Sequence, residues 1–510
     1  MATKNFYDAV LLGTELPTLL AGGLLAKRGF RVLLVGQSSP SASYQVDGLS
    51  LPRRPFTLPG HDSPAISRIF TELALRPLLK RRIRPLSPAL QAVLPNHRLD
   101  LAQQPELISQ EVEREFPSVR RAADDFLRAS QRSWERINRL LERDLVWPPG
   151  GFFERREFSR AAMHHPFGKD GVGPTPLSEL PDDHPFRLMA GWALRFMDGT
   201  TLGTTNSERE LRQFAALLHS AAMVDGGCAE LRDVLIENLR THNGDVRFAE
   251  RVEQVVVQRS AVVGVRLSLS EEEMGCHFVL SGIPIARLCP LLSERRELDA
   301  MLEEVGKPEP RYLRYSLNAV VDRAALPEAM GRNVLLLSDP RCPHGEGALW
   351  VETDACSDSD RAVVTAEALV PALPTGELLH YLSDMRERVY ANLLSLMPFI
   401  EGRTQLVDSP HDGRPVQHPR EDRESDPPEA WSRGPTTMPI VYTYPRRGVH
   451  GCTALPARTP VKRLLLCNEQ VVPGLGYEGA FLAAWSAARI VTKALEREWM
   501  NRGRWTKVEL

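Results

Sequence analysis

Residues 8–37, DAVLLGTELPTLLAGGLLAKRGFRVLLVGQ, decide the fold of this chain. The apolar run Val10–Leu12 ends at Gly13, which predicts a buried strand followed by a tight turn. Apolar residues then recur with helical spacing over residues 16–27, and the β-rich run 31–35 predicts a second strand. A strand, a helix and a parallel strand within about 30 residues form the opening unit of a dinucleotide-binding sheet.

The turn of this unit departs from the usual G-x-G-x-x-G fingerprint. Gly13 keeps the first glycine, but Glu15 stands at the second and Thr18 at the third. A carboxylate about 4 Å from a phosphate charge costs roughly 4 kcal/mol at an intermediate effective dielectric. The acidic residue expected after the second strand, to hold a ribose, is replaced by Gly36. The stretch is therefore compatible with a dinucleotide site in which Glu15 turns away or pairs with a cation, and equally with a βαβ unit that binds no nucleotide.

The composition of the 510 residues narrows the class of protein. A net charge of −2 gives no indication of a nucleic-acid partner. No run reaches the roughly 18 apolar residues that a membrane span requires. The seven cysteines are scattered without a CxxC pair, so we expect reduced thiols in a cytoplasmic protein. The adjacent His164 and His165 would point in different directions, and no metal site is predicted.

The middle of the chain predicts a helical region and then a β-meander. Pro105 and Pro117 each open a helix, and the second helix has an aromatic and aliphatic face suited to a core or to a lid over an apolar tunnel. Residues 147–185 are rich in proline, glycine and aromatics and predict a long loop or flap. A helix over 229–240 and alternating strands over 246–269 follow.

The last third contains a second informative stretch. Residues 360–370 and 377–396 predict helices, and the polar residues 408–435 predict a flexible insertion or exposed loop. Residues 463–467 predict a buried strand, and the glycine-rich loop that follows runs into a helix from about residue 480. Such a loop presents backbone amides to an anion.

In this order the parts resemble the superfamily of flavin-containing amine oxidases and phytoene-desaturase-type carotenoid enzymes, whose fold is shared by Rab GDP-dissociation inhibitors and Rab escort proteins. The resemblance rests on the βαβ unit at 8–36, the Gly-Gly helix at 226–240, the meander at 246–268, the strand at 278–284 and the C-terminal Pro-Gly-x-Gly motif.

The resemblance implies a mixed α/β fold: a Rossmann-like FAD/NAD(P)-binding domain with a parallel sheet and a β-meander, and an inserted substrate domain of sheet and helices. The dinucleotide-binding domain would comprise residues 1–64, 216–289 and 456–510. The substrate domain would comprise a helical lid segment at 65–215 and a second segment at 290–455, with the polar insertion at 408–435.

The resemblance also implies FAD as cofactor. Gly13 and Thr14 would face the pyrophosphate, Val252 would pack on or pair with the adenine, and Asn468 stands where the family has an aspartate near the ribityl or pyrophosphate. The loop Gly474, Leu475, Gly476 and Tyr477 would lie along the flavin. The departures from the family pattern are Glu15, Thr18, Gly36, Cys467 and Asn468. No catalytic side chain can be named, because in such enzymes the cofactor carries the redox chemistry.

Two functions follow as hypotheses. The first is an FAD-dependent oxidoreductase that transfers hydride from an apolar substrate, such as an isoprenoid or lipid, to the flavin. The second is a flavin-less pseudoenzyme of the same fold that binds a protein or a lipid through the same cleft. The sequence Leu-Gly-Thr-x-Leu-Pro at Leu12–Pro17 resembles that of the Rab escort proteins, which use the same fold without flavin redox chemistry. A peripheral membrane contact is compatible with either function, and the sequence assigns no oligomeric state.

Overall fold

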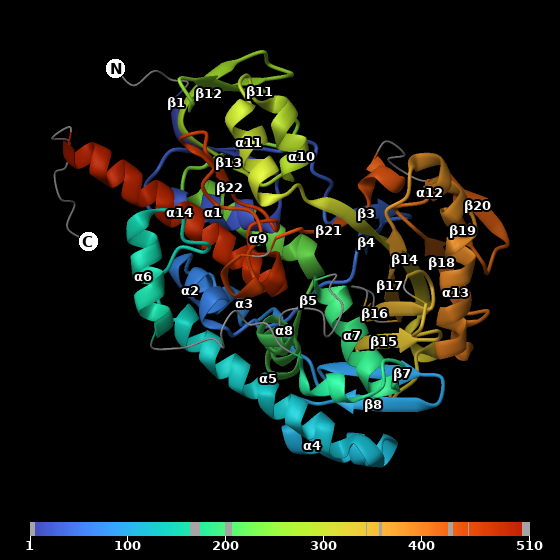
Figure 1. Cartoon of the computed structure of the whole chain (residues 1–510). Coiled ribbons are helices and arrows are strands. Elements are labelled where there is room, and N and C mark those ends of the chain that lie inside the picture. Colours follow the sequence, from blue (N-terminus) through green and yellow to red (C-terminus); the bar gives the residue numbers. More distant parts are fainter. Residues whose placement is uncertain are drawn as a thin grey trace.

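Two large sheets organise the computed structural model of this protein (Figure 1). It describes residues 6–163, 174–198, 207–342, 344–355, 360–426, 432–446 and 448–501. The predicted mixed α/β fold class is confirmed, with parallel strands in one sheet and mainly antiparallel strands in the other.

The first sheet joins both ends of the chain. Its order is β10-β2-β1-β13-β12-β11, with β22 paired to β13. β1, β2, β10, β13 and β22 pair in parallel, and β11 and β12 complete the antiparallel meander with β13. The strands are β1 (Phe6–Leu12), β2 (Val32–Val35), β10 (Asp245–Arg247), β11 (Val252–Gln258), β12 (Ala261–Leu267), β13 (Glu273–Ser281) and β22 (Leu464–Leu466). The predicted βαβ unit and C-terminal strand are therefore confirmed, and so is the meander, except that its predicted first strand, β10, pairs in parallel with β2 instead.

Helices bury this sheet because its central strands are apolar on both faces. Helix α1 (Leu16–Lys27) is buried nearly throughout and packs against α14 (Gly476–Asn501) and α9 (Gly227–Thr241). The short helix α10 (Ile285–Leu288) and α11 (Arg296–Val305) follow β13, and α2 (Pro64–Glu72) packs on α14.

The second sheet has the order β20-β19-β18-β14-β17-β16-β15-β7-β8, with β21 on β14. Helices α12 (Thr375–Leu382) and α13 (Met385–Leu396) cover one face (Figure 1). Its strands are β7 (Leu90–Leu94), β8 (His97–Leu101), β14 (Glu309–Asp322), β15 (Asn333–Leu337), β16 (Ala348–Ala355), β17 (Arg361–Pro371), β18 (Thr404–Asp408), β19 (Val416–His418), β20 (Arg423–Ser425) and β21 (Ile440–Thr443).

A helical layer lies against the other face of the second sheet and reaches the first (Figure 1). It comprises α4 (Pro105–Glu115), α5 (Arg120–Leu141), α7 (Pro185–Asp198) and α8 (Ser207–Ser220), with α6 (Phe152–Met163) beyond the end of α5. The remaining elements are the short helix α3 (Arg76–Leu79), the hairpin β3 (Ser43–Val46) and β4 (Leu49–Pro52), and the small sheet of β5 (Thr57–Leu58), β6 (Ile83–Pro85) and β9 (Ala222–Val224).

Four predictions of local structure were wrong. Residues 83–101, inside the segment 65–215 predicted to be helical, contain the strands β6, β7 and β8. Residues 360–370 form no helix, because β17 pairs with β14 and β16 and is buried on both faces, which removes the alternation that would have identified a strand. Residues 147–185 contain helix α6 within the predicted flap. In the described part of 408–435, β19 and β20 form strands, and Asp408 and His411 are fully buried.

Candidate functional site

The predicted phosphate turn lies between the end of β1 and the start of α1. Gly13 has a φ of +93°, a left-handed conformation that suits glycine, and its amide donates to the carbonyl of Val35 at 2.9 Å. The amide of Thr14 donates to Ser39 Oγ at 3.4 Å. Arg232 of α9 donates to Thr14 Oγ1 and also to the carbonyl of Pro40 at 3.1 Å. The turn is thus tied to the loop after β2 and to α9.

The Glu15 carboxylate fills this turn. Its Oε1 accepts a hydrogen bond from Ser39 Oγ at 2.8 Å, whereas Oε2 is buried without a hydrogen-bond partner. A Cβ added to Gly13 would overlap Oε2, and one added to Gly282 would lie 2.9 Å from it. Burial raises the pKa of Glu15, although Ser39 and the cations of Arg232 and Arg287 act in the opposite direction. The carboxylate therefore points into the turn between β1 and α1, where the resemblance places a pyrophosphate.

The Gln37 side chain pairs with the backbone of Val252. Gln37 Nε2 donates to the Val252 carbonyl at 3.1 Å, and the Val252 amide donates to Gln37 Oε1 at 2.7 Å. Both residues are buried. The resemblance assigns Val252 to the adenine. The side-chain amide of Gln37 therefore occupies both backbone groups of the position that an adenine would use.

Gly36 lies in a close approach of two backbones. A Cβ at this position would overlap the carbonyl oxygen of Phe248, and the Gly36 amide donates to the carbonyl of Arg247 at 2.9 Å. A ribose-binding acid cannot be placed at residue 36 with this backbone. The sequence showed the missing acid but not its steric cause, which depends on a contact 212 positions away along the chain.

Asn468 and Cys467 close the C-terminal side of the same region. Asn468 Nδ2 donates to the Ile283 carbonyl at 2.8 Å, and its Oδ1 accepts from the Gln470 amide at 3.0 Å. Cys467 is fully buried, and Thr18 Oγ1 donates to its carbonyl at 3.5 Å. These polar groups bind the backbone of the loops that follow β13 and β22.

The glycine-rich C-terminal loop is covered by side chains of this protein. A Cβ on Gly474 would lie 2.6 Å from Arg209 Cδ and 2.7 Å from Cys452 Cα. Gly476 has a φ of +52°. The ring of Tyr477 meets the ring of Phe56 edge-on with centroids 5.1 Å apart, and burial raises its pKa. The loop predicted to lie along a flavin instead packs against α8 and the segment after β4.

A buried ion pair that the sequence analysis missed holds α8 against this loop. Arg212 Nε lies 3.0 Å from Glu478 Oε2, Arg212 Nη2 bonds the other oxygen, and both side chains are buried. Glu478 lies in the first turn of α14, where a carboxylate complements the helix dipole. The guanidinium also lies 3.7 Å from the centroid of the Trp134 ring. An acidic residue just after the Gly-x-Gly motif was the available signal.

The residues present do not fit FAD in this conformation. Gln37 occupies the backbone groups assigned to adenine, the Glu15 carboxylate occupies the turn assigned to phosphate, and Arg209, Cys452 and Phe56 cover the loop assigned to the flavin. The loop that contains Gln37 and Ser39 connects the turn at Gly13 to Val252, because Ser39 bonds Thr14 and Gln37 bonds Val252. Asn468 donates to Ile283, the residue after Gly282. Gly474, Gly476 and Tyr477 form a second cluster under α8.

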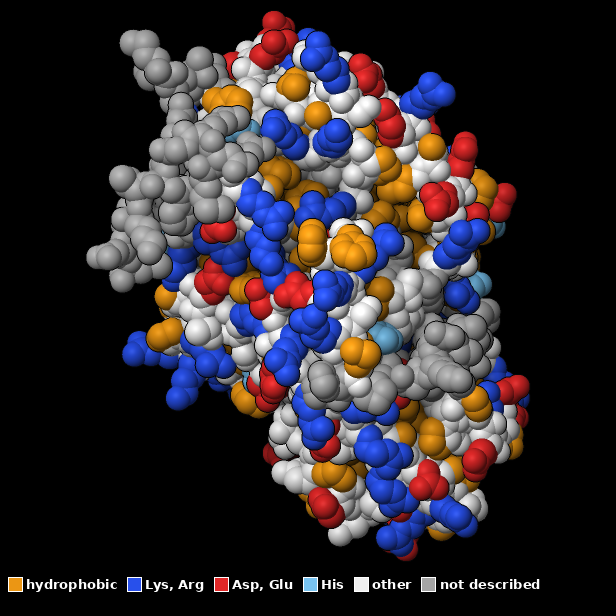
Figure 2. Space-filling model, turned by 60° about the vertical axis from the view of Figure 1, so that its left-hand side comes forward, with side chains coloured by type: hydrophobic (Ala, Val, Ile, Leu, Met, Phe, Trp, Pro, Cys, Tyr) orange, Lys and Arg blue, Asp and Glu red, His pale blue; other side chains and the backbone are white. Residues whose placement is uncertain are grey.

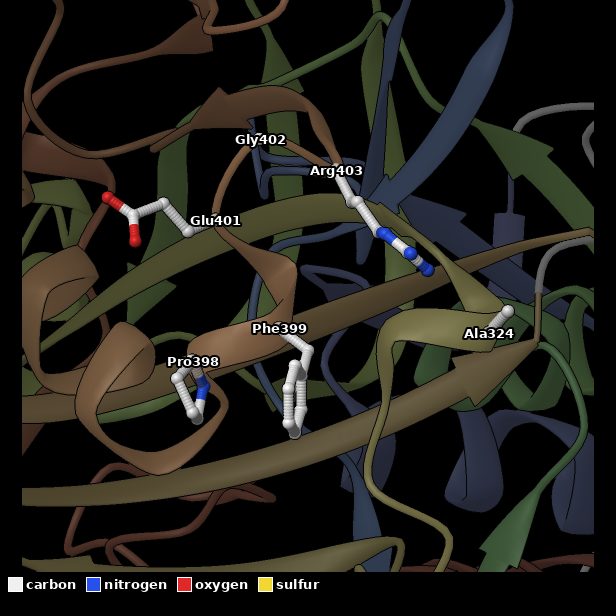
Figure 3. A pocket seen from close by; sticks show the side chains of 6 residues that line it. All are labelled: Ala324, Pro398, Phe399, Glu401, Gly402 and Arg403. Carbon is white, nitrogen blue, oxygen red and sulfur yellow. The ribbon is translucent and has the colours of Figure 1, made fainter.

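Two surface hollows lie away from these clusters. One of about 520 Å³ is open and lined by Phe399, Arg403 and their neighbours, with Phe399 72% exposed (Figure 3). The other, of about 720 Å³, lies between β7, β8 and the end of α13 and includes His97 and Arg98. None of the residues predicted to bind cofactor lines either hollow.

The described residues show how potential metal ligands and apolar helices are distributed. Within them, no group of three or more His, Cys, Asp or Glu side chains is placed to hold a metal ion. His164 and His165 lie outside the described residues. Across the same part of the chain, no helix combines the length and the apolar character that crossing a bilayer demands.

Comparison with solved structures identifies the fold. No protein-family model matches the chain, and no curated protein matches its sequence. An oxidoreductase from Methanosarcina mazei is 13% identical with a TM-score of 0.58, over 96% of this chain and 99% of that one. Putrescine oxidase bound to putrescine is 15% identical with a TM-score of 0.59, over 96% and 99%. Cyclohexylamine oxidase from Brevibacterium oxydans is 13% identical with a TM-score of 0.55, over 96% and 100%.

These neighbours are oxidoreductases, and the resemblance stated from the sequence is confirmed for the fold. The likeness covers nearly the whole of each chain, so it includes the second sheet and the helical layer as well as the parallel sheet. The chain therefore has the fold of the flavin amine oxidases, with a Rossmann-like domain and a second, sheet-and-helix domain.

Proposed function

We propose that this protein is a flavin-less binding module with the flavin amine oxidase fold. It would act by holding a protein or an apolar ligand, without redox chemistry of its own. This is the second of the two hypotheses drawn from the sequence. The pairing of Gln37 with Val252 carries the proposal.

That pairing bears on the cofactor because it satisfies both hydrogen-bonding groups of a buried backbone position. An adenine entering there must first displace the amide of Gln37, whose two bonds measure 3.1 and 2.7 Å. The net worth of a hydrogen bond is about 0.5–1.5 kcal/mol, and a buried polar group left unpaired costs about 1–3 kcal/mol. The exchange therefore gains nothing in hydrogen bonds and leaves the Gln37 amide without its partners.

The Glu15 carboxylate adds an electrostatic obstacle at the neighbouring position. A diphosphate in this turn would meet either a carboxylate charge or the work of moving Glu15 out of its bond to Ser39. The repulsion is about 4 kcal/mol at 4 Å with an effective dielectric of about 20. Adenine and diphosphate are both opposed, so a flavin has no favourable anchor at this end of the fold.

An FAD-dependent oxidoreductase acting on an apolar substrate is the second candidate. Its support is the likeness to solved oxidoreductases across nearly the whole chain. Two cations near Glu15, Arg232 and Arg287, would suit a diphosphate if the carboxylate moved away. This candidate keeps FAD as its cofactor and predicts a yellow protein.

One measurement separates the two candidates. The protein is purified without added cofactor, its visible spectrum is recorded, and thermal unfolding is then followed with increasing FAD. A ligand at 100 times its Kd stabilises a protein by about 2.7 kcal/mol, which moves the melting temperature measurably. The proposal expects no flavin absorbance and no shift. A flavin spectrum that survives gel filtration would replace it with the second candidate.

Restoring the site provides a second, positive test. The double variant E15G/Q37A removes the two obstacles at the adenine and diphosphate end of the site, and we expect it to gain FAD-dependent thermal stabilisation that the wild type lacks. The matched control is E271G/Q45A, because Glu271 is exposed with a φ of +54° and Gln45 is exposed. If E15G/Q37A gains no FAD binding while remaining folded, Glu15 and Gln37 are not by themselves what excludes the cofactor.

A further inference from the structure

Helix α6 presents an unusual outward face. Phe152, Phe153 and Met163 are 74%, 75% and 73% exposed. Arg156 and Arg160 are also exposed and lie on the same face, because positions 152, 156, 160 and 163 recur at helical spacing. These five side chains form the aromatic and cationic outward face of α6.

The inward face of α6 is firmly attached to the rest of the protein. Phe158 is buried and meets the Trp147 ring with centroids 4.9 Å apart. Glu154 pairs with Arg458 at 2.7 Å, and Glu157 pairs with Arg489 of α14 at 3.1 Å. The helix is therefore held as a rigid platform, and its outward side chains do not fold back onto the core.

These inward ion pairs leave the outward charge of α6 uncompensated. Both acidic residues of the helix are neutralised by arginines of other elements. Arg155, Arg156 and Arg160 have no carboxylate partner within the described ranges. The chain as a whole carries a net charge of −2, so this face concentrates positive charge that the composition does not show.

The surface around α6 carries further cations among acidic side chains. Arg139, near the end of α5, and Arg143, just after it, are exposed, and so are Glu142 and Asp144, of which Asp144 pairs with Arg489. The view in Figure 2 shows Lys and Arg side chains gathered in a band, with hydrophobic side chains and some Asp and Glu side chains among them. Exposed aromatics set among cations match the interfacial region of a bilayer, where aromatic rings lie at headgroup level and arginines meet anionic lipid.

We propose that the outward face of α6 binds this protein to the surface of an anionic lipid bilayer. An acidic protein is the less suitable partner, because two phenylalanines standing about three-quarters exposed need an apolar phase as well as counter-charges. A bilayer supplies both at once, with acyl chains for Phe152 and Phe153 and lipid headgroups for Arg156 and Arg160. The contact is peripheral and reversible.

Vesicle co-sedimentation tests this proposal with the full chain. The probes are vesicles of phosphatidylcholine alone and of phosphatidylcholine mixed with phosphatidylserine, each at low and high salt. We expect binding to the mixed vesicles only, weakened by salt because screening shortens the reach of exposed charges. The proposal is overturned if, at low salt, the protein stays in the supernatant while the mixed vesicles sediment. An acidic protein as the partner of this face would predict that result.

Two variants locate the contact on α6. R156E/R160E is expected to weaken binding at least about 25-fold, since each arginine near an anionic surface contributes about fivefold. F152S/F153S is expected to weaken it at least about tenfold. R98E/R251E and F399S are the matched controls, because these side chains are exposed elsewhere and their loss should leave binding unchanged.

Thermal unfolding of each variant shows whether it is folded, and all four replace exposed side chains. Binding that is equally weakened by R98E/R251E would show a non-specific charge effect and overturn the assignment to α6. Binding unaffected by both α6 variants would do the same. The proposal is independent of whether FAD binds, because the vesicles contain none.

Discussion

Gln37 and Val252, which are separated by 215 positions in the chain, form a closed two-bond pair in which one side-chain amide satisfies both backbone groups of a buried residue. Gln37 has a φ of +53° and Ser38 one of +54°, so the backbone after β2 turns sharply to bring the amide to the meander. The hydrogen-bonding groups that the resemblance assigns to an adenine are thus satisfied by a side chain of the protein itself.

Replacing Gln37 tests the worth of this pair. Q37A leaves the Val252 amide and carbonyl without partners in a buried position, and we expect a loss of about 1–3 kcal/mol of unfolding free energy. Urea denaturation measures the loss. Q45A, at an exposed glutamine, should remain within about 0.5 kcal/mol of the wild type. Equal stability of Q37A and wild type would show that the pair contributes little.

Glu15 predicts a pH-dependent stability. Because burial raises the pKa of its carboxyl in the folded state, the folded protein holds the proton more tightly than the unfolded chain. Stability from this group is fully present below the ordinary pKa of about 4.5 and is lost as the pH rises through the raised folded value. E15Q stays neutral, so its stability advantage over wild type should grow as the pH rises above 4.5, by about 1.4 kcal/mol for each unit of the shift.

Chemical denaturation at several pH values measures this difference. E271Q, at an exposed glutamate, is the control and should follow the wild type at every pH. An E15Q protein that is less stable than wild type at neutral pH would mean that Glu15 is ionised and well paired in the folded state, contrary to the direction of its pKa.

Removing one partner of the buried Arg212–Glu478 pair should cost far more unfolding free energy than replacing both partners with apolar residues. R212M leaves the Glu478 carboxylate buried without its cation, and we expect a loss of about 3–5 kcal/mol. R212M/E478L removes both charges and should recover most of that loss. A double-mutant cycle from urea denaturation gives the coupling. Additive single losses would show that the two side chains do not depend on one another.

His411 predicts acid sensitivity. Burial, together with the nearby cations of Arg53 and Arg433, lowers its pKa to about 3. The imidazole is neutral in the fold, so its contribution is present above the ordinary pKa of 6.5 and is lost as the pH falls from there toward 3, at up to about 1.4 kcal/mol per pH unit. H411N should show a flatter decline of stability between pH 6.5 and 3, measured against H380N at an exposed histidine. Parallel declines of H411N and wild type would assign the acid sensitivity to other groups.

The sequence could predict the fold because its signals are local. The run Val10–Leu12, the turn at Gly13 and the helix after it are set by periodicity and by glycine geometry, and the structure confirms them. The same reasoning failed over β17, where a strand buried on both faces shows no alternation, and over α6, whose Pro- and Gly-rich flanks indicated a loop.

The candidate site was predictable only in part. The departures at Glu15 and Gly36 were visible in the sequence, and their positions in the turn follow from it. The groups that fill the site could not be predicted from the sequence. Gln37 meets Val252 and Arg212 meets Glu478 across more than 200 positions, and no local pattern encodes such pairs. The roles in cofactor binding that the resemblance gave to Asn468 and Tyr477 stay predictions.

The central sheet places a constraint on how this chain is made. β1 pairs with β13, and β13 in turn receives β22, so strands from the beginning, middle and end of the polypeptide lie side by side. During synthesis, the edge of β13 that pairs with β22 stays open until residues 464–466 leave the ribosome. The strands before residue 282 must therefore wait, with the backbone groups of this edge unpaired, until residues 282–466 have been translated, and this open edge is where chaperone capture or premature aggregation of the nascent protein would begin.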